Sequence, residues 1–172
     1  MPGDLPFVKC RHGAGPRHVT FHPGGHCAYV VNELDSTVAA YHWNSERGEL
    51  KPFQIITTLP TTYTGDNTGA EIAIAPSGKF VYASNRGHDS IVIYSVDPAD
   101  GMLAHVGWES VQGRKPRFFG LDPDGSHLYG ANENSHTIVE FRIDRETGKL
   151  IPTGQIIETG SPSCIVFRDL KQ

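Results

Sequence analysis

Arginine and glutamate recur in pairs along this chain, a combination that suits the binding of a small anion. Each pair joins one cation to one carboxylate across a similar stretch of sequence: Arg17 with Glu33, Glu71 with Arg86, and Arg117 with Glu133. Arginine presents parallel N–H donors to a carboxylate or phosphate, and a nearby glutamate can accept a proton. These side chains are therefore candidates for a site that binds an anionic substrate and moves a proton.

Two histidines stand close to these pairs in the sequence. His18 follows Arg17, and His88 lies two residues after Arg86. Imidazole exchanges protons near neutral pH, so both residues add acid–base capacity. A structural role is the alternative, because three Arg–Glu pairs would equally serve as ion pairs that join neighbouring units of the fold. The pattern alone leaves both interpretations open.

The elements that would position these residues come from an internal repeat. Three stretches align on one another: 15–32, 70–85 and 116–132. Their anchors step by 53 and then 47 residues: Pro23, Pro76 and Pro123; Tyr29, Tyr82 and Tyr129; and Asn32, Asn85 and Asn132. A repeat of this period indicates one supersecondary unit per repeat.

Each repeat contains four short runs in which apolar and polar residues alternate, as is typical of β-strands. The runs fall at 18–22, 28–32, 37–43 and 53–59; at 71–75, 80–84, 90–96 and 103–111; and at 117–122, 127–131, 137–143 and 151–158. Turns with proline and glycine separate the first two runs of each repeat, and no helical periodicity competes. Four antiparallel strands per repeat predict an all-β fold built from β-propeller blades.

We expect one partial β-propeller domain over residues 1–172, with blades at about 15–59, 69–111 and 115–158. A first strand of a further blade is expected at 160–168. Propellers close with four to eight blades, so three blades and one inner strand leave the ring open. We therefore expect the chain to be part of a longer protein, and its open blade edges offer a route to self-association.

The blade geometry explains how the charged pairs would meet. In a propeller the innermost strand lines a central channel, and the second strand returns antiparallel to it. The start of the first strand and the end of the second then share one face of the disc. Arg17 and Glu33 occupy those two positions in the first repeat. We therefore expect each hairpin to bring its own arginine and glutamate together at one mouth of the channel.

Composition limits the partners of the chain. Its 172 residues carry a formal net charge of -4 and no basic run, which argues against nucleic acid. The longest apolar runs have five or six residues, far short of a membrane span, and no secretory signal is visible, so we expect a cytoplasmic protein.

His22 and His26 have a spacing that suits a metal ion but lack a third ligand, so we predict a turn and no metal site.

Four motifs, in this order, resemble the lactonase family of seven-bladed β-propellers. They are Gly-Pro-Arg-His at 15–18, Tyr-Val-Val-Asn-Glu-Leu-Asp-Ser-Thr at 29–37, Gly-Asp-Asn-Thr-Gly-Ala-Glu-Ile at 65–72 and Ala-Ser-Asn-Arg-Gly-His-Asp-Ser-Ile at 83–91. The family includes the bacterial propeller-type 6-phosphogluconolactonase and the fungal 3-carboxy-cis,cis-muconate cyclase. The similarity runs from about residue 13 to residue 167 and corresponds to the C-terminal half of a family member.

The resemblance implies a role for three of the charged residues. Arg17, Glu33 and Arg86 match the active-site positions proposed for the family and would be catalytic. The expected position at the channel mouth, and not the resemblance, makes substrate-binding candidates of His18, Glu71, His88, Arg117 and Glu133. The implied activity is hydrolysis of a small anionic sugar lactone without a cofactor, as in the 6-phosphogluconolactonase step of the pentose phosphate pathway. The arginines would hold the phosphate or carboxylate, and Glu33 would activate water as a general base.

Two other functions fit the same residues. A lactone-forming muconate cyclase would use the arginines to hold carboxylates while Glu33 or a histidine moves the proton. A non-catalytic propeller fragment would act as an interaction module. A further functional histidine of the family lies upstream, in a blade that this chain does not contain, so we expect catalysis to require additional blades.

Overall fold

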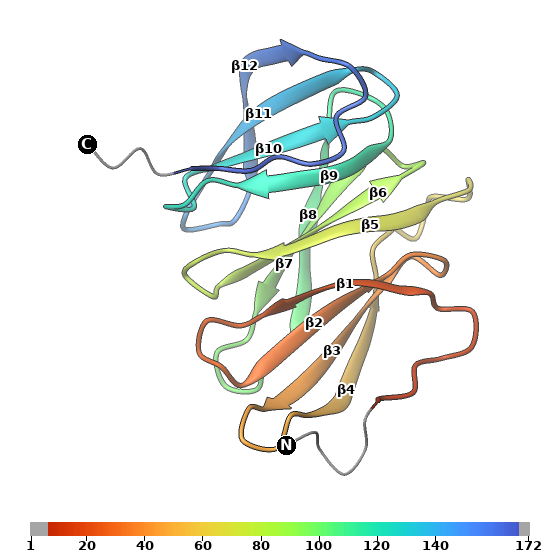
Figure 1. Cartoon of the computed structure of the whole chain (residues 1–172), viewed down its shortest axis with the longest axis vertical. Coiled ribbons are helices and arrows are strands. Elements are labelled where there is room, and N and C mark those ends of the chain that lie inside the picture. The colour runs from red at the N-terminus through yellow and green to blue at the C-terminus, as the bar shows by residue number, and fades with distance from the viewer. Residues whose placement is uncertain (1–6, 169–172) are drawn as a thin grey trace.

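The computed structural model describes residues 7–168, which form twelve strands in three four-stranded antiparallel sheets (Figure 1). The first sheet consists of β1 (Pro16–Phe21), β2 (Cys27–Asn32), β3 (Thr37–Asn44) and β4 (Glu49–Thr57). The second consists of β5 (Thr68–Ile74), β6 (Phe80–Arg86), β7 (Ser90–Val96) and β8 (Leu103–Ser110). The third consists of β9 (Pro116–Leu121), β10 (His127–Asn132), β11 (Thr137–Ile143) and β12 (Leu150–Glu158).

The three sheets are blades arranged side by side through their first strands. Within each sheet the strands pair in chain order, so β1, β5 and β9 each form one edge. β1 contacts β5, and β5 contacts β9, so these edges lie together (Figure 1). This arrangement confirms the predicted all-β architecture of propeller blades. For brevity we call the sheets blades 1, 2 and 3.

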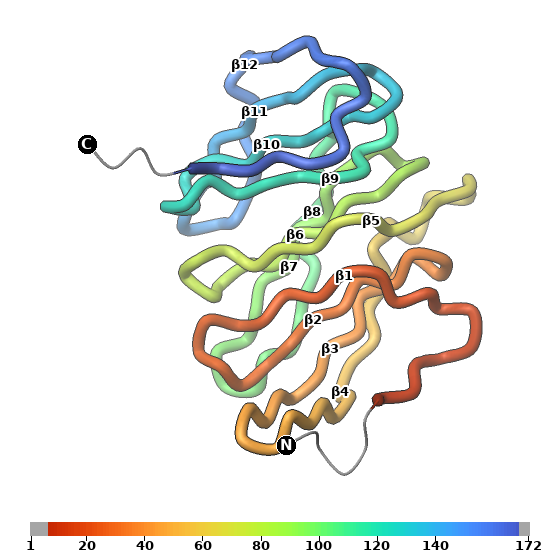
Figure 2. The backbone as a smooth tube through the Cα atoms, in the orientation of Figure 1, coloured from red at the N-terminus to blue at the C-terminus, as the bar shows by residue number. Residues whose placement is uncertain are grey.

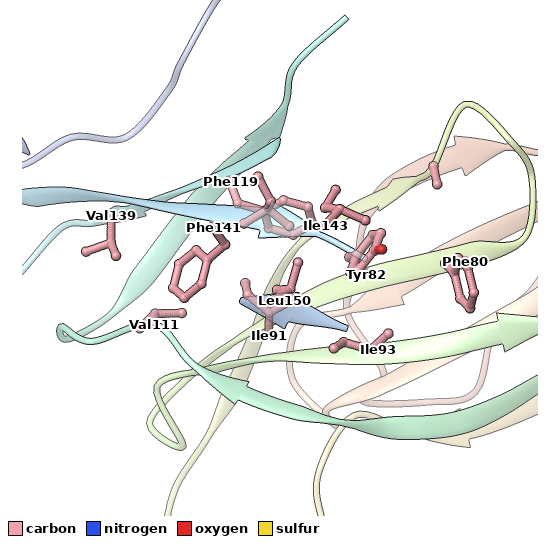
Figure 3. Packing of buried hydrophobic residues seen from close by; sticks show 12 residues of the cluster. Phe80, Tyr82, Ile91, Ile93, Val111, Phe119, Val139, Phe141, Ile143 and Leu150 are labelled. Carbon is pink, nitrogen blue, oxygen red and sulfur yellow. The ribbon is translucent and has the colours of Figure 1, made fainter. Parts of the chain in front are cut away.

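Apolar side chains fill the spaces between blades. One cluster joins blades 1 and 2 and includes Tyr29, Val38, Val81 and Tyr94, all buried. The other joins blades 2 and 3, where Tyr82 and Ile91 pack against Phe119, Phe141 and Leu150 (Figure 3). Removing these side chains from water supplies the main driving force for stacking the blades.

Tyrosines on the second strands form polar links from one blade to the next. Tyr29 Oη donates to the carbonyl oxygen of Gly101 at 2.8 Å, and Tyr82 Oη donates to that of Gly148 at 2.9 Å. Both acceptors lie just before the fourth strand of the following blade. The recurring tyrosine noted in the sequence is therefore a joint between blades.

Amide side chains make further links of the same kind. Gln54 both donates to the carbonyl oxygen of Leu103 and accepts from its N–H, each at 2.8 Å. Asn85 Nδ2 donates to the carbonyl oxygen of Thr58 at 2.8 Å, and Asn132 Nδ2 donates to that of Val111 at 3.0 Å. The recurring asparagine thus holds the end of the preceding blade's fourth strand.

One face of blade 3 is open. The equivalent faces of blades 1 and 2 are covered by blades 2 and 3 respectively. Tyr129, the counterpart of Tyr82, donates instead to Glu140 Oε1 within its own sheet, at 2.9 Å. A cavity of about 450 Å³ lies on this face, lined by Tyr129, Ile138, Glu140, Gln155 and Ile157.

The structure differs from the sequence prediction in two segments. Residues 160–168, expected to form a first strand of a further blade, are not assigned to a strand within the described chain. They run extended along β9, where the ring of Phe167 lies 5.4 Å from that of Tyr129 (Figure 2). β4 begins at Glu49, before its predicted start at residue 53, since Pro52 is tolerated on the outermost strand of a sheet.

Candidate functional site

The charged residues singled out in the sequence gather where the first strands begin and the second strands end. Arg17 lies at the start of β1, Glu33 directly follows β2, and Arg86 ends β6. These strand ends share one edge of the blades, on the right in Figure 1. The antiparallel hairpins place them there because each reverses direction once between its two strands.

Glu33 bridges two cations from two blades. Its Oε1 accepts a hydrogen bond from Arg86 Nη2 across the junction of blades 1 and 2. Its Oε2 lies 3.6 Å from Arg17 Nε, within the same hairpin. The carboxylate therefore holds the two arginine side chains at a fixed separation, one on each oxygen.

Both arginines are also anchored to the backbone of β5. Arg17 Nη1 donates to the carbonyl oxygen of Ala70 at 2.6 Å, and Arg86 Nη2 donates to that of Gly69 at 3.1 Å. The Arg86 side chain is only 7% exposed, and its Nε has no hydrogen-bond partner among the described residues. This geometry fixes the guanidinium groups before any substrate arrives, as charge-stabilising groups require.

The clustered positive charges shift the pKa values at the rim. The hydrogen bond from Arg86 holds the pKa of Glu33 below its usual value, and the charges of Arg86, Arg17 and Arg117 act in the same direction. Burial and the charge of Arg86 lower the pKa of Arg17, although a guanidinium stays protonated in proteins. Two arginines thus contact one carboxylate and the charge of a third acts on it, which leaves the rim suited to an additional anion.

His18 and Glu71 form a second contact between blades 1 and 2. His18 Nδ1 lies 2.8 Å from Glu71 Oε1. The Glu71 side chain is buried, whereas 41% of the His18 side chain is exposed. A histidine with one nitrogen on a carboxylate and an accessible ring is an arrangement that can transfer protons.

The predicted pairing within hairpins holds only for Arg17 and Glu33. Glu71 does not pair with Arg86, because the register of β5 and β6 puts Arg86 opposite Thr68, three residues before Glu71, and the N–H of Glu71 donates to Ser84 Oγ. No ion pair between Arg117 and Glu133 is found in the described chain; Arg117 instead contributes its charge to the cluster around Glu33.

His88 and Glu133 do not contact the Arg17–Glu33–Arg86 cluster among the described residues. His88 lies in the turn after β6, where its Nδ1 is 2.7 Å from Ser90 Oγ and its ring stands edge-on to that of Tyr63 at 4.9 Å. Glu133 follows β10 in blade 3, at the position that Glu33 has in blade 1. Their expected roles in substrate binding therefore stay predictions.

Sequence reasoning missed the amide network that holds the loop before β5. Asn67 Nδ2 donates to Ser36 Oγ at 2.9 Å and to Asn85 Oδ1 at 3.0 Å, and Asn67 Oδ1 accepts from the N–H of His88 at 3.1 Å. The loop thus joins the rim to both blades. The Gly-Asp-Asn motif at 65–67 is one of those that resemble the family, but nothing in its spacing indicates these partners.

Other polar clusters lie away from the rim. The rings of His22 and His26 lie 4.4 Å apart, tilted by 51°, at the opposite ends of the strands. Together with Lys79 and Phe80 these histidines line a cavity of about 540 Å³. Within residues 7–168 no three side chains of His, Cys, Asp or Glu are placed to hold a metal ion. In the same part of the chain no helix has the length and apolarity needed to cross a membrane.

The chain is similar in sequence to lactonases. Residues 3–167 match the family described as "Lactonase, 7-bladed beta-propeller". The chain is 39% identical over 155 residues to a 6-phosphogluconolactonase of Bacillus subtilis, covering 90% of this chain and 44% of that protein. It is 42% identical over 164 residues to a 6-phosphogluconolactonase of Formosa agariphila, covering 93% and 45% respectively. The chain therefore spans less than half the length of these curated relatives.

Solved structures show the same likeness in three dimensions. The periplasmic gluconolactonase PpgL of Pseudomonas aeruginosa superposes with a TM-score of 0.90 at 34% identity, over 96% of this chain and 46% of that one. Sequence and fold thus agree over almost the entire chain, and it belongs to the lactonase family of seven-bladed β-propellers.

Proposed function

We propose that this chain carries part of the active site of an enzyme that hydrolyses a small anionic sugar lactone, with 6-phosphogluconolactone as the substrate. The observation that supports this most directly is the convergence of Arg17 and Arg86 on the two oxygens of Glu33 at one rim. The names of the relatives, 6-phosphogluconolactonase and gluconolactonase, point to the same class of substrate.

The proposed chemistry needs only side chains. Hydrolysis requires that the lactone carbonyl oxygen be stabilised as it gains negative charge, and fixed guanidinium groups suit that task. A phosphate or carboxylate of the substrate would bind the same arginines in a bidentate manner. Arg117, whose charge acts on Glu33, would complete the anion-binding rim.

Glu33 fits a positioning role better than the role of general base expected from the family resemblance. Both of its oxygens face arginines, and its lowered pKa makes it a weak proton acceptor at neutral pH. In the proposed site Glu33 sets the distance between Arg17 and Arg86. Its replacement by alanine would therefore disturb substrate binding more than proton transfer.

The cytoplasm is the compartment we propose, as the composition suggested, because a phosphorylated sugar lactone is a metabolite of that compartment. PpgL is described as periplasmic, which makes cell fractionation the test of this point. Recovery of the protein in a periplasmic extract would contradict the proposal.

The activity test is hydrolysis of 6-phosphoglucono-1,5-lactone, followed as acid release in a weakly buffered assay and corrected for spontaneous hydrolysis. Wild-type protein is compared with Arg17→Ala and Arg86→Ala, which should each lower kcat/KM by about 10²–10³. Arg145→Ala is the matched control, because this exposed arginine lies at the other ends of the strands. Equal rates in all four proteins would exclude the rim from the reaction.

A further inference from the structure

Hydrolysis at the rim needs a proton acceptor other than Glu33, and a histidine in β1 is placed to be that acceptor. Both carboxylate oxygens of Glu33 already form ion pairs with arginines. His18, next to Arg17 in β1, has an exposed imidazole whose Nδ1 is held by a carboxylate. The further inference concerns this pair and rests on the proposed lactonase function.

Glu71 is placed to fix the tautomer of His18. A carboxylate oxygen 2.8 Å from Nδ1 accepts a hydrogen bond, so Nδ1 carries the proton and Nε2 keeps its lone pair. Glu71 Oε1 also accepts from the N–H of Ile72 at 3.0 Å, and the N–H of Glu71 donates to Ser84 Oγ at 2.9 Å. These contacts hold the carboxylate still while the imidazole stays accessible.

The burial of the Glu71 carboxylate is energetically unfavourable in a way that packing alone does not explain. Its Oε2 is buried and has no hydrogen-bond partner among the described residues. An unpaired buried carboxylate oxygen is destabilising. Such a cost is characteristic of functional sites, where a carboxylate is retained to orient a catalytic group.

Arg17 places the histidine beside the substrate. Arg17 Nη1 lies 3.3 Å from each nitrogen of the His18 ring, so the guanidinium and the imidazole are in contact. A lactone carbonyl that accepts a hydrogen bond from Arg17 would therefore lie within reach of a water molecule on His18. The electrophile, the water and the base are then neighbours, as general-base catalysis requires.

We propose that His18 is the general base of this site and that Glu71 is its positioning residue. His18 Nε2 removes a proton from water as the water oxygen bonds to the lactone carbonyl carbon. The carbonyl electron pair moves onto its oxygen, which Arg17 stabilises. The electron pair then returns, the bond between that carbon and the ring oxygen breaks, and the imidazolium gives its proton to the departing ring oxygen. One water and one lactone yield one hydroxy acid, with no other reactant.

The first test reads the His18 tautomer directly and does not need activity. Nitrogen-15 NMR of uniformly labelled chain at pH 8 should show His18 with a protonated Nδ1 and a bare Nε2. Glu71→Gln should lose this preference, because an amide can donate to Nδ1 as well as accept from it. His127, whose Nδ1 lies 3.2 Å from Asp122 Oδ2 at the far ends of the strands, should be unchanged in Glu71→Gln and serves as the internal control. A protonated Nε2 on wild-type His18 would overturn the inference.

The second test uses the lactone assay. His18→Ala should lower kcat by about 10²–10⁴ with a smaller change in KM, and added imidazole should restore part of the rate. Glu71→Gln should lower kcat less, without rescue by imidazole. The assay uses the full-length protein that contains this chain. Its inactivity would count against the proposed function itself, and the tautomer result would then decide the His18–Glu71 pair alone. An active wild type with an equally active His18→Ala variant would refute the assignment of the base.

Discussion

Glu33 and Arg86 lie one repeat apart, 53 residues along the chain, and their side chains form an ion pair between neighbouring blades. They occupy the same position in successive blades, with opposite charge. The contact therefore serves two purposes, because it joins blade 1 to blade 2 and orients a cation at the rim. This double role leads to the first prediction.

Arg86→Ala should weaken the fold as well as the activity. The substitution removes a buried guanidinium and leaves Glu33 without its closest partner. We expect the free energy of unfolding to fall by about 1–3 kcal/mol, less than for a fully buried pair because Glu33 is partly exposed. Urea denaturation measures the change. Arg145→Ala, at an exposed ion pair, should stay within about 0.5 kcal/mol of wild type, and an equal loss in both variants would contradict the prediction.

The acid stability of the protein should depend on Glu33. Its pKa in the folded state is lowered, chiefly by the hydrogen bond from Arg86, so it binds its proton later on acidification than in the unfolded chain. The stabilising contribution is complete above the ordinary value of 4.5 and is lost as the pH falls below it through the folded-state pKa. Glu33→Gln should be less stable than wild type at pH 7, with the difference shrinking below pH 4.5. A difference independent of pH would refute this account.

Gly87 permits the loop before β5 to approach the turn after β6. Its φ is +137°, and a Cβ at this position would clash with the carbonyl oxygen of Asp66. Gly87→Ala should therefore destabilise the protein by about 1–3 kcal/mol and displace the loop. Thermal unfolding measures the effect. Gly107→Ala is the control, since a Cβ there meets no atom within 4 Å, and a similar loss in both variants would contradict the explanation.

Tyr82→Phe, at the junction of two blades, should lower the free energy of unfolding more than Tyr129→Phe, at the open face of blade 3. The substitution removes the hydroxyl that donates to Gly148 and leaves a buried carbonyl oxygen without this donor. We expect a loss of about 1–2 kcal/mol in the free energy of unfolding. Tyr129→Phe, in which the lost partner is the half-exposed Glu140, should cost less. The comparison uses denaturation midpoints at equal m-values, and the reverse order would exclude the assigned role.

The sequence predicted the blades well because turn chemistry and strand alternation recur at one period. Pro23, Pro76 and Pro123 mark the same turn in each repeat, and the strands on either side of it are where the pattern placed them. Residues 160–168 match the start of a repeat and lie along β9 but form no strand pairing in the described chain, so the repeat alone could not predict their state.

The site was predicted less completely, for a geometric reason. Pairing within a hairpin was expected to bring each arginine to its own glutamate, but the register of β5 and β6 puts Arg86 opposite Thr68 and not opposite Glu71. The stronger signal was the period itself. Glu33 with Arg86, and His18 with Glu71, are each separated by 53 residues, and positions one repeat apart meet at the junction of successive blades. The partners of Asn67 lie in a loop without a counterpart in the repeat, so no pattern could indicate them.

The joints made by Tyr29, Tyr82 and Gln54 share one property. The hydrogen bonds of these side chains to the following blade all go to main-chain atoms: the carbonyl oxygens of Gly101 and Gly148, and both backbone groups of Leu103. Such hydrogen bonds depend on the position of the backbone in the neighbouring blade and not on which side chains that backbone carries. Side chains along the fourth strands can therefore be substituted without loss of these hydrogen bonds between blades.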